Sequence, residues 1–398
     1  MTERLYYRDS FLRSFDAQVV SCEKEGERWR VVLDRTAFYP TSGGQPHDTG
    51  KLDDVPVVEV ADDAEQKVVH YTSAAIKPGP VHGEIDWARR IDHMQQHTGQ
   101  HLLSAAFIEL FKFPTVSFHL GKESSTIDLA APSIVARHLE EAERRTNEII
   151  LEDRPIVIRF GTAEELAEAG IRKKVEREGI LRAIEVEGFD RQPCGGTHLE
   201  RTGQAGLLLL RKLERRRDSW RLEFVCGLRA LATARGDYAT LGKAAQQLSC
   251  GLPDVPAVLG KLVEKARGSH NEVEQLEKRL AIHEARELLA ANSAPTGVAR
   301  LIAAVLDQAS LTYLHHILMN LLPAGNVVAF LASRGTGFVM FGKMADTAGD
   351  MAAIFRKAAE ELGAKGGGSA TLAQGSLSDP SKADAFVTRA KELYLAAR

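Results

Sequence analysis

The chain has 398 residues, of which 44% are hydrophobic and 26% charged, and its formal net charge is −3. This length exceeds one ordinary hydrophobic core and predicts two to four domains. The net charge excludes a uniformly basic nucleic-acid-binding protein but is compatible with a local basic patch. No apolar run is long enough to cross a bilayer and no secretory signal is visible, so we expect a cytoplasmic protein without membrane contact.

Residues 1–87 are predicted to form a β-barrel-like N-terminal domain. The runs RWRVVLD, PVVEV and KVVHY are rich in β-branched and aromatic residues and are divided by Gly, Pro and Asp clusters. Short strands at this spacing are typical of a small barrel or sandwich. In the stretch TAFYPTSGGQPHDTG at 36–50, the pair Gly43-Gly44 is compatible with a hairpin turn. A turn alone does not explain the density of Gly, Gln, His and Asp there.

Residues 88–235 are predicted to form an α+β core. The stretch DWARRIDHMQQHTGQHLLSAAFIELF has the three- and four-residue apolar spacing of a helix, and a second helix follows Ser133. PIVIRF and ILRAIEVEGFD predict strands, and Thr162 with Glu165 predicts a capping box. GLLLLRKLERRRDSWRLEFVCG predicts a hairpin that turns near residues 217–219.

Three histidines lie on the first predicted helix of this core. His93, His97 and His101 follow one another every four residues, so neighbouring pairs share one helix face. A histidine pair at this spacing commonly binds zinc, but histidines that only pack are an alternative. The spacing does not choose between the pair His93–His97 and the pair His97–His101.

The stretch CGGTH supplies a second half of a metal site. Its two glycines allow a tight loop in which Cys194 and His198 face one ion. With two helical histidines this completes a tetrahedral nitrogen and sulfur set, which suits zinc; the alternative is a glycine turn with a chance Cys and His. The helical motif HTGQH lacks the glutamate of HExxH, so peptide hydrolysis is not expected, whereas an activated ester is easier to cleave.

The chain's four cysteines show no CxxC spacing, which favours thiols or metal ligands over disulfides.

The C-terminal part is predicted to comprise a helical linker at 236–293 and an α/β module at 294–398. Apolar residues at near-heptad spacing over 259–290 indicate either a coiled coil, and thus a possible homodimer, or a single amphipathic helix. In the module, ARLIAAVLD, NVVAFLAS and GFVMFGK predict strands, and GAKGGGSATLAQGS is of low complexity. No Asp/His metal cluster appears there, which argues against an active phosphoesterase.

A basic strip lies between Arg201 and Arg229, where eight Lys and Arg stand against three Asp and Glu, a net of +5. Beside an active site, such a strip would contact nucleic-acid phosphates; alone, it is compatible with a solvated hairpin face.

Four motifs, in this order, resemble those of alanyl-tRNA synthetase editing modules and of their freestanding relatives, the AlaX group. They are TAFYPTSGGQPHDTG, HTGQHLLSAAF, CGGTH and the GGG-x(4)-AQG pattern of the C-terminal module. The last is similar to the DHHA1-type domain shared with DHH phosphoesterases, which the long form of the group carries. The resemblance covers nearly the whole chain.

The resemblance implies a multidomain α+β protein with a barrel-like domain, a zinc-containing editing core, a helical linker and a C-terminal α/β module. It implies that one Zn²⁺ per chain is bound by His97, His101, Cys194 and His198, and that His93 is left over. The implied reaction is hydrolysis, in trans, of the ester that joins serine or glycine to the terminal adenosine of alanine tRNA. No catalytic residue beyond the zinc site is implied. The alternative is a non-catalytic tRNA-binding protein with a structural zinc site.

The resemblance also suggests substrate contacts. The loop with Gly43, Gly44 and Gln45 is expected to close over the pocket. Gln100 stands where many synthetases have a hydroxyl residue, so it either contacts the substrate or packs. Further candidates for substrate contact are Ser117 and Thr197. Candidates for contact with the tRNA backbone are Arg211, Arg215, Arg216, Arg217, Gly366, Gly367 and Gly368.

Overall fold

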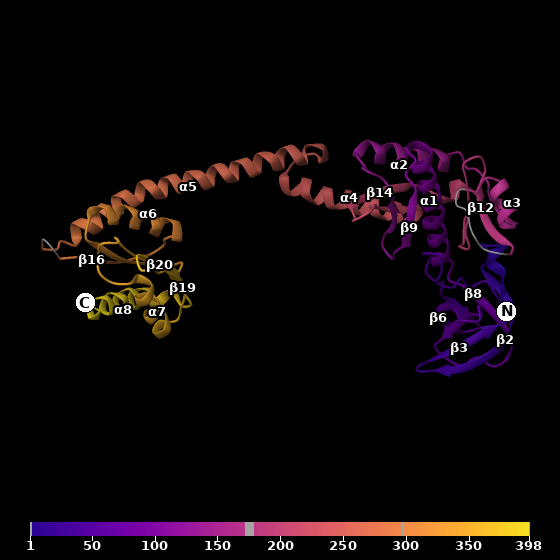
Figure 1. The fold of residues 1–398 in the computed structure, drawn as a ribbon, viewed down its shortest axis with the longest axis horizontal. Coiled ribbons are helices and arrows are strands. Elements are labelled where there is room, and N and C mark those ends of the chain that lie inside the picture. The colour runs from indigo at the N-terminus through magenta and orange to yellow at the C-terminus, as the bar shows by residue number, and fades with distance from the viewer. Residues whose placement is uncertain (1, 172–178, 296–297, 398) are drawn as a thin grey trace. The chain divides into compact units, whose positions relative to one another are not determined.

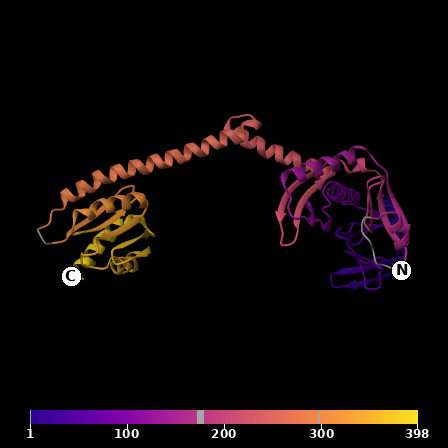
Figure 2. The same ribbon diagram turned by 45° about the horizontal axis from the view of Figure 1, so that its top comes forward.

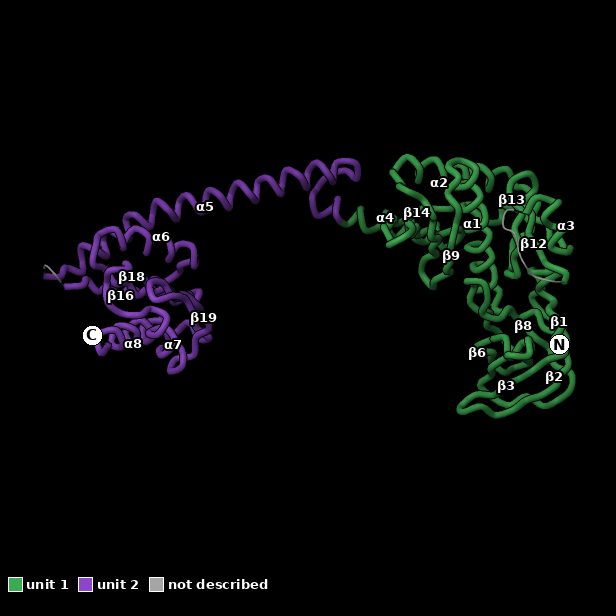
Figure 3. The backbone as a smooth tube through the Cα atoms, in the orientation of Figure 1, with its two compact units in different colours: residues 1–243 green, residues 244–398 purple. Residues whose placement is uncertain are grey.

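The computed structural model describes residues 2–171, 179–295 and 298–397 (Figure 1). The chain divides into two compact units, residues 1–243 and 244–398 (Figure 3). Within the described ranges, no helix is both long enough and apolar enough to cross a membrane.

The N-terminal part of the first unit is a closed barrel of six strands, which confirms the predicted barrel. Around the barrel the order is β2-β3-β7-β6-β5-β8. Side chains alternate along β2, so Phe15, Ala17 and Val19 belong to the barrel core. The barrel strands are β2 (Ser14–Glu25), β3 (Arg28–Leu33), β5 (Gly50–Leu52), β6 (Val55–Asp62), β7 (Val68–Thr72) and β8 (Gly79–Ile85). The short elements outside it are β1 (Glu3–Arg4), η1 (Leu5–Tyr7) and β4 (Arg35–Thr36).

The rest of the first unit is built around helix α1 (Trp87–Phe111), which is buried over most of its length. The hairpin β14–β15 lies on one side of α1 and β12 on the other (Figure 2). Gly99 allows α1 to approach β15 closely, because a Cβ there would lie 2.8 Å from Cys226 Sγ. Two sheets have the orders β14-β15-β10-β9 and β11-β12-β13.

The strands of these two sheets are β9 (Thr115–Leu120), β10 (Ser125–Leu129), β11 (Ile156–Gly161), β12 (Leu181–Val186), β13 (Asp190–Pro193), β14 (Leu208–Arg215) and β15 (Trp220–Cys226). The accompanying helices are α2 (Ala136–Leu151), α3 (Ala163–Glu168) and η2 (Thr202–Ala205). The predicted hairpin is β14–β15. The predicted capping box is also present, since Thr162 Oγ1 accepts from Glu165 N and the Glu165 carboxylate accepts from Thr162 N.

The second unit carries a five-stranded sheet of order β16-β17-β18-β20-β19. Helices α7 and α8 cover one face of it, and α5 and α6 the other. The boundary between the two units falls inside α4 (Gly227–Leu248). The strands are β16 (Arg300–Leu306), β17 (Val327–Ser333), β18 (Phe338–Lys343), β19 (Ala364–Gly368) and β20 (Leu372–Leu377). The helices are η3 (Leu252–Asp254), α5 (Val255–Ala291), α6 (Leu311–Leu321), η4 (Leu322–Ala324), α7 (Met351–Leu362), η5 (Pro380–Lys382) and α8 (Ala383–Ala396).

The stretch 236–293, predicted as a helical linker, contains the end of α4, η3 and the long helix α5, and the near-heptad apolar residues of α5 are exposed. Leu259, Leu262, Val273, Leu276 and Leu280 each expose about half of their surface. A coiled coil or homodimer through this stripe remains a prediction, as does the division of the chain into four domains.

The glycine-rich stretch of the module, which is of low complexity in sequence, forms an edge strand. Gly366, Gly367 and Gly368 lie in β19, which pairs antiparallel with β20. A Cβ at Gly366 would lie 2.2 Å from the carbonyl oxygen of Gln374, so glycine is needed for the close backbone approach.

Candidate active site

Three histidines and one cysteine from two distant segments meet in the first unit. The candidate ligand atoms of His97, His101, Cys194 and His198 all lie within 4.8 Å of one another. Cys194 Sγ is 3.4 Å from His97 Nε2 and 3.2 Å from His198 Nε2. The three histidines are buried. The four residues that the sequence singles out therefore form one cluster that could hold a metal ion.

Two backbone features bring the halves of this cluster together. His97 and His101 lie one turn apart on α1, and Cys194 directly follows β13. Gly196 allows the loop to pass close to α1, because a Cβ there would lie 2.2 Å from His97 Cε1. The buried Arg182 fixes the loop, since its Nη1 donates to the carbonyl oxygens of Cys194 at 2.6 Å and Gly196 at 2.9 Å.

Hydrogen bonds orient the His97 ring. Gln45 Oε1 accepts from the backbone N–H of Thr197 at 3.1 Å, which identifies it as the amide oxygen. It therefore accepts from His97 Nδ1 as well, at 2.8 Å, so His97 Nε2 keeps its lone pair toward Cys194.

Polar groups also lie next to the other two rings, within hydrogen-bond distance for His198 but beyond it for His101. His198 Nδ1 lies 3.2 Å from Thr98 Oγ1, and His101 Nδ1 lies 3.6 Å from Asp190 Oδ2. In each ring the second nitrogen is left for an ion. Outer partners of this kind fix the ring orientation of metal-binding histidines.

The electrostatics of the cluster favour a thiolate. Burial by itself raises the pKa of Cys194, but His97 and His198 outweigh burial and hold this pKa well below its usual value. Burial also holds the pKa of His198 well below its usual value. Burial opposes protonation of His101, but Asp190 and Cys194 raise its pKa to about 9. A metal ion would therefore displace a proton from His101 on binding.

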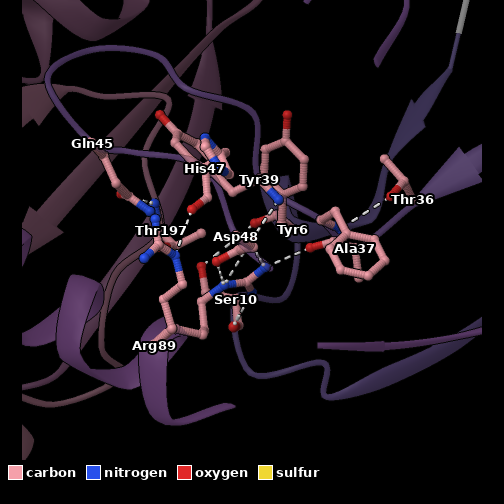
Figure 4. Close-up of polar contacts among 12 residues, drawn as sticks. Tyr6, Ser10, Thr36, Ala37, Tyr39, Gln45, His47, Asp48, Arg89 and Thr197 are labelled. Atoms are coloured by element: carbon pink, nitrogen blue, oxygen red, sulfur yellow. Dashed lines mark hydrogen bonds and ion pairs between the residues drawn. The ribbon is translucent and has the colours of Figure 1, made fainter. Parts of the chain in front are cut away.

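A cavity of about 480 Å³ opens beside the cluster. Among the predicted substrate contacts, Gly43, Gln100 and Ser117 line it, together with His97, His101 and Cys194. Gly44, Gln45 and Thr197 are not among the described residues that form its wall. The side chain of Gln45 instead donates to Thr197 Oγ1 at 2.8 Å, and both residues are fully buried (Figure 4). Gln45 and Thr197 thus lie behind the residues of the cluster.

Gly44 supports the cavity wall from outside. Gly43 and Gly44 have φ values of 55° and 83°, and together they form the turn between Ser42 and Gln45. A Cβ at Gly44 would lie 2.7 Å from the carbonyl oxygen of Phe118 in β9. The turn is therefore packed on β9, whose Phe118 ring stacks on His97 at 5.3 Å.

Hydrogen-bonded hydroxyl groups lie along one wall of the cavity. Gln100 Nε2 donates to Ser104 Oγ at 2.9 Å, and Ser104 Oγ lies 2.7 Å from Thr115 Oγ1. Ser117 Oγ donates to Asp128 Oδ2 at 2.5 Å. Because Ser117 gives its proton to Asp128, its oxygen can still accept a hydrogen bond from a ligand. Ile108, Pro114, Val116 and Phe118 provide apolar surface.

Sequence reasoning missed a fully buried ion pair, Arg90 with Asp48, that links the barrel loop to α1. Arg90 also donates to the carbonyl oxygens of Ser10 at 2.8 Å and Ala37 at 2.5 Å, and Asp48 accepts from Tyr39 N (Figure 4). Ser10 Oγ in turn accepts from the backbone N–H of the metal-site residue His198 at 3.3 Å. The only sequence signal was the density of polar residues around Asp48.

The predicted tRNA contacts on the hairpin are partly neutralised within the chain. Arg211 pairs with Asp237, and Arg216 with Glu214. Arg215 lies over the Trp220 ring at 4.9 Å. For Arg217, none of the described residues provides an ion-pair partner. The net charge of +5 counted from the sequence is therefore larger than the positive charge that the strip has available for a ligand.

Comparison with known proteins yields two family models and several relatives. The model for class II (A) tRNA synthetases matches residues 4–89. The model for the threonyl and alanyl tRNA synthetase second additional domain matches residues 181–222, which include Cys194 and His198.

Three relatives illustrate the extent of similarity. The alanyl-tRNA editing protein AlaX-L of Pyrococcus horikoshii is 29% identical over 94% of each chain. The alanyl-tRNA editing protein Aarsd1 of Mus musculus is 30% identical over 71% of this chain and 73% of its own. The alanine–tRNA ligase of Pyrococcus abyssi is 31% identical over 96% of this chain but only 42% of the ligase.

Proposed function

The chain belongs to the family of alanyl-tRNA editing proteins, and from this premise we propose that it hydrolyses mischarged alanine tRNA in trans, in the cytoplasm. The substrates are Ser-tRNA(Ala), Gly-tRNA(Ala) or both, and the bond that breaks is the ester to the terminal adenosine. One observation carries the proposal: three buried imidazoles and one half-buried cysteine form a cluster, and three of its members, His97, His101 and Cys194, line a cavity of about 480 Å³.

The donor set fits zinc, with one site per chain. His97, His101, Cys194 and His198 provide three nitrogens and one sulfur, and the low pKa of Cys194 favours the thiolate that binds a metal. When bound, zinc supplies Lewis-acid polarisation and lowers the pKa of a coordinated water. Four protein donors are also the usual number of a structural site, so a zinc that only shapes the cavity is the alternative.

The cavity wall accounts for the choice of amino acid. Among the described residues, its lining includes no carboxylate and no lysine, so the ester and a water meet only neutral side chains besides the cluster. Ser117 Oγ and the Gln100 amide are in a position to bind the hydroxyl of a serine ester. Hydrogen-bonding groups discriminate between a hydroxyl and a methyl group far better than an apolar pocket does. Gly43 bounds the same cavity from the barrel loop.

The remaining expectations complete the proposal. We assign residues 1–87, 88–235, 236–293 and 294–398 to a barrel domain, an editing core, a helical linker and a C-terminal module. The exposed arginines of the β14–β15 hairpin and the glycines of β19 are proposed to contact the tRNA backbone, and the exposed stripe of α5 is proposed to pair two chains.

The purified chain tests the function directly. We expect it to release serine or glycine from alanine tRNA, to spare Ala-tRNA(Ala), and to lose this activity with a strong chelator. If serine stays attached while the tRNA still binds, the chain is a tRNA-binding protein with a structural metal site.

A further inference from the structure

A second cavity, of about 520 Å³, lies beside the N-terminal half of α1. Its charged lining comes from three elements of the first unit. Arg89 and Asp92 lie on α1, Lys122 follows β9, and Arg229 lies in α4. His93, the histidine outside the metal cluster, lines it as well.

The charge of this cavity is positive. Arg229 Nε donates to Asp92 Oδ1 at 3.2 Å, and Arg229 Nη1 donates to the carbonyl oxygen of Gly121 at 2.9 Å. This pair joins α1 to the end of β9 and neutralises the one carboxylate of the lining. Arg89 and Lys122 remain as two uncompensated cations. In the parts of the chain that the structure describes, no carboxylate pairs with either of them.

Hydrogen-bonding capacity is also unused there. Arg89 Nε donates to the carbonyl oxygen of His47 at 2.8 Å, and its two Nη groups have no acceptor among the described residues (Figure 4). His93 is 4% exposed, and its Nδ1 has no partner within the same described ranges. Burial, with the nearby arginines, lowers the pKa of His93 to about 3, so the ring is neutral and adds no charge to the lining.

The two cavities are lined by neighbouring stretches of the same segments. His97 follows His93 by four positions, a rise of about 6 Å along a helix. The same two segments border both cavities. Gly43 and Phe118 line the first, whereas Pro46 and Gly121 line the second. A nucleotide chain whose 3′ end lies in the first cavity can therefore extend past the second.

We infer that this second cavity binds a backbone phosphate of the tRNA whose aminoacyl ester occupies the first. The ligand class follows from two free cations and unused N–H donors around a hollow large enough for a phosphodiester. The assignment of the phosphate to a tRNA rests on the proposed function. The site is distinct from the predicted contacts on the β14–β15 hairpin and on β19.

Binding of uncharged alanine tRNA at several KCl concentrations tests the inference without requiring hydrolysis. The test variant is Lys122→Gln, because Lys122 is exposed and has no ion pair among the described residues. The matched control is Lys77→Gln, which removes an equally exposed lysine from the barrel, outside the cavity. Loss of one phosphate contact is expected to reduce the slope of log K against log salt by about 0.7–0.9, and the affinity about 5-fold at 0.1 M salt.

The double variant Arg89→Gln/Lys122→Gln is expected to reduce the slope by about twice that amount, whereas Lys77→Gln leaves it unchanged. In deacylation of Ser-tRNA(Ala), Lys122→Gln and the double variant are expected to have a raised KM and a preserved kcat. Hydrolysis of 3′-O-seryl-adenosine, which has no phosphate, is expected to be equal in the wild-type chain and Lys122→Gln.

The outcomes separate this inference from the proposed function. If Lys122→Gln binds tRNA with the wild-type slope, or if the wild-type chain does not bind tRNA, the inference is overturned. A different outcome is that the salt slope of tRNA binding falls for Lys122→Gln but not for Lys77→Gln, while the wild-type chain hydrolyses no ester. In that case the phosphate site stands and the proposed function fails.

Discussion

His97 Nδ1 and Gln45 Oε1 lie 2.8 Å apart, although 52 residues separate them in the chain. Gln45 belongs to the barrel loop, and His97 belongs to the metal cluster on α1. The same amide group accepts from Thr197 N and donates to Thr197 Oγ1, so one side chain ties the barrel loop, α1 and the CGGTH loop together. Gln45 is therefore a positioning residue for the metal site.

Replacing Gln45 is expected to weaken metal binding. Gln45→Ala removes the acceptor of His97 Nδ1–H, and loss of such an outer partner typically lowers metal affinity about 10- to 100-fold. Competition with a zinc chelator measures this affinity. Gln45→Glu keeps an acceptor and should retain more zinc than Gln45→Ala. Equal zinc affinity in Gln45→Ala and the wild-type chain would show that the contact is incidental.

The two outer histidines of α1 are expected to differ. His101→Ala removes a member of the cluster and should lower bound zinc and deacylation together. His93→Ala should keep zinc near one equivalent per chain, because His93 lies outside the cluster. Metal analysis of both purified variants decides this point, and the reverse pattern would mean that His93 and His97 are the helical ligand pair.

A buried histidine makes the barrel sensitive to acid. His70 is fully buried, with Nε2 2.8 Å from Thr36 Oγ1 and Nδ1 3.3 Å from the carbonyl oxygen of Val31. Burial lowers its pKa from 6.5 to about 4. As the pH falls, the unfolded chain protonates His70 near pH 6.5, whereas the folded chain protonates it only near pH 4. The contribution of neutral His70 to the free energy of unfolding is therefore complete above pH 6.5 and is lost as the pH falls toward 4. The loss amounts to about 3 kcal/mol.

Urea unfolding between pH 7 and pH 4.5 measures this effect. The control is His70→Gln, which cannot titrate in this range, so its stability should fall less steeply with acid than that of the wild-type chain. Parallel pH dependence of the two chains would show that other groups control the acid sensitivity.

Patterns in the sequence were sufficient to predict the strands and helix starts that depend on nearby residues. The β-branched runs became β3, β6 and β7, and the capping residues Thr162 and Glu165 begin α3 as expected. The four members of the metal cluster were also identified, because their residue types and the resemblance agreed. What failed depended on contacts between distant segments. The GGG stretch was identified only as low-complexity sequence, because the sequence does not show that another strand, β20, pairs with it.

The sequence also does not show which buried polar side chains form hydrogen bonds or ion pairs with one another. Gln45 and Thr197 were expected to contact substrate, but their side chains satisfy each other behind the cluster. The pairing of Arg90 with Asp48 was not predicted, since nothing local shows that residues 42 positions apart come together. The dense polar loop at 36–50 thus combines a cavity wall at Gly43 with structural support at Gln45 and Asp48.

The two neighbouring glycines of the CGGTH loop provide a matched pair for the last prediction. A Cβ at Gly196 would lie 2.2 Å from His97 Cε1 and 2.5 Å from His97 Nδ1, closer than any real contact of this kind. A Cβ at Gly195 would meet nothing nearer than Tyr7 Oη at 3.6 Å. Gly196→Ala must therefore displace either the His97 ring or the loop, and each movement separates Cys194 from His97.

Gly196→Ala is accordingly expected to purify with much less than one zinc per chain, and Gly195→Ala with nearly one. Zinc content by atomic absorption and the thermal unfolding midpoint give two independent measures. Overpacking of this kind costs about 1–3 kcal/mol, so the midpoint of Gly196→Ala should also fall. Deacylation is a weaker measure here, because Gly195 and Gly196 both line the cavity and either methyl group could hinder the ester. Full zinc content in Gly196→Ala would show that the loop holds its ligands without the close approach to α1.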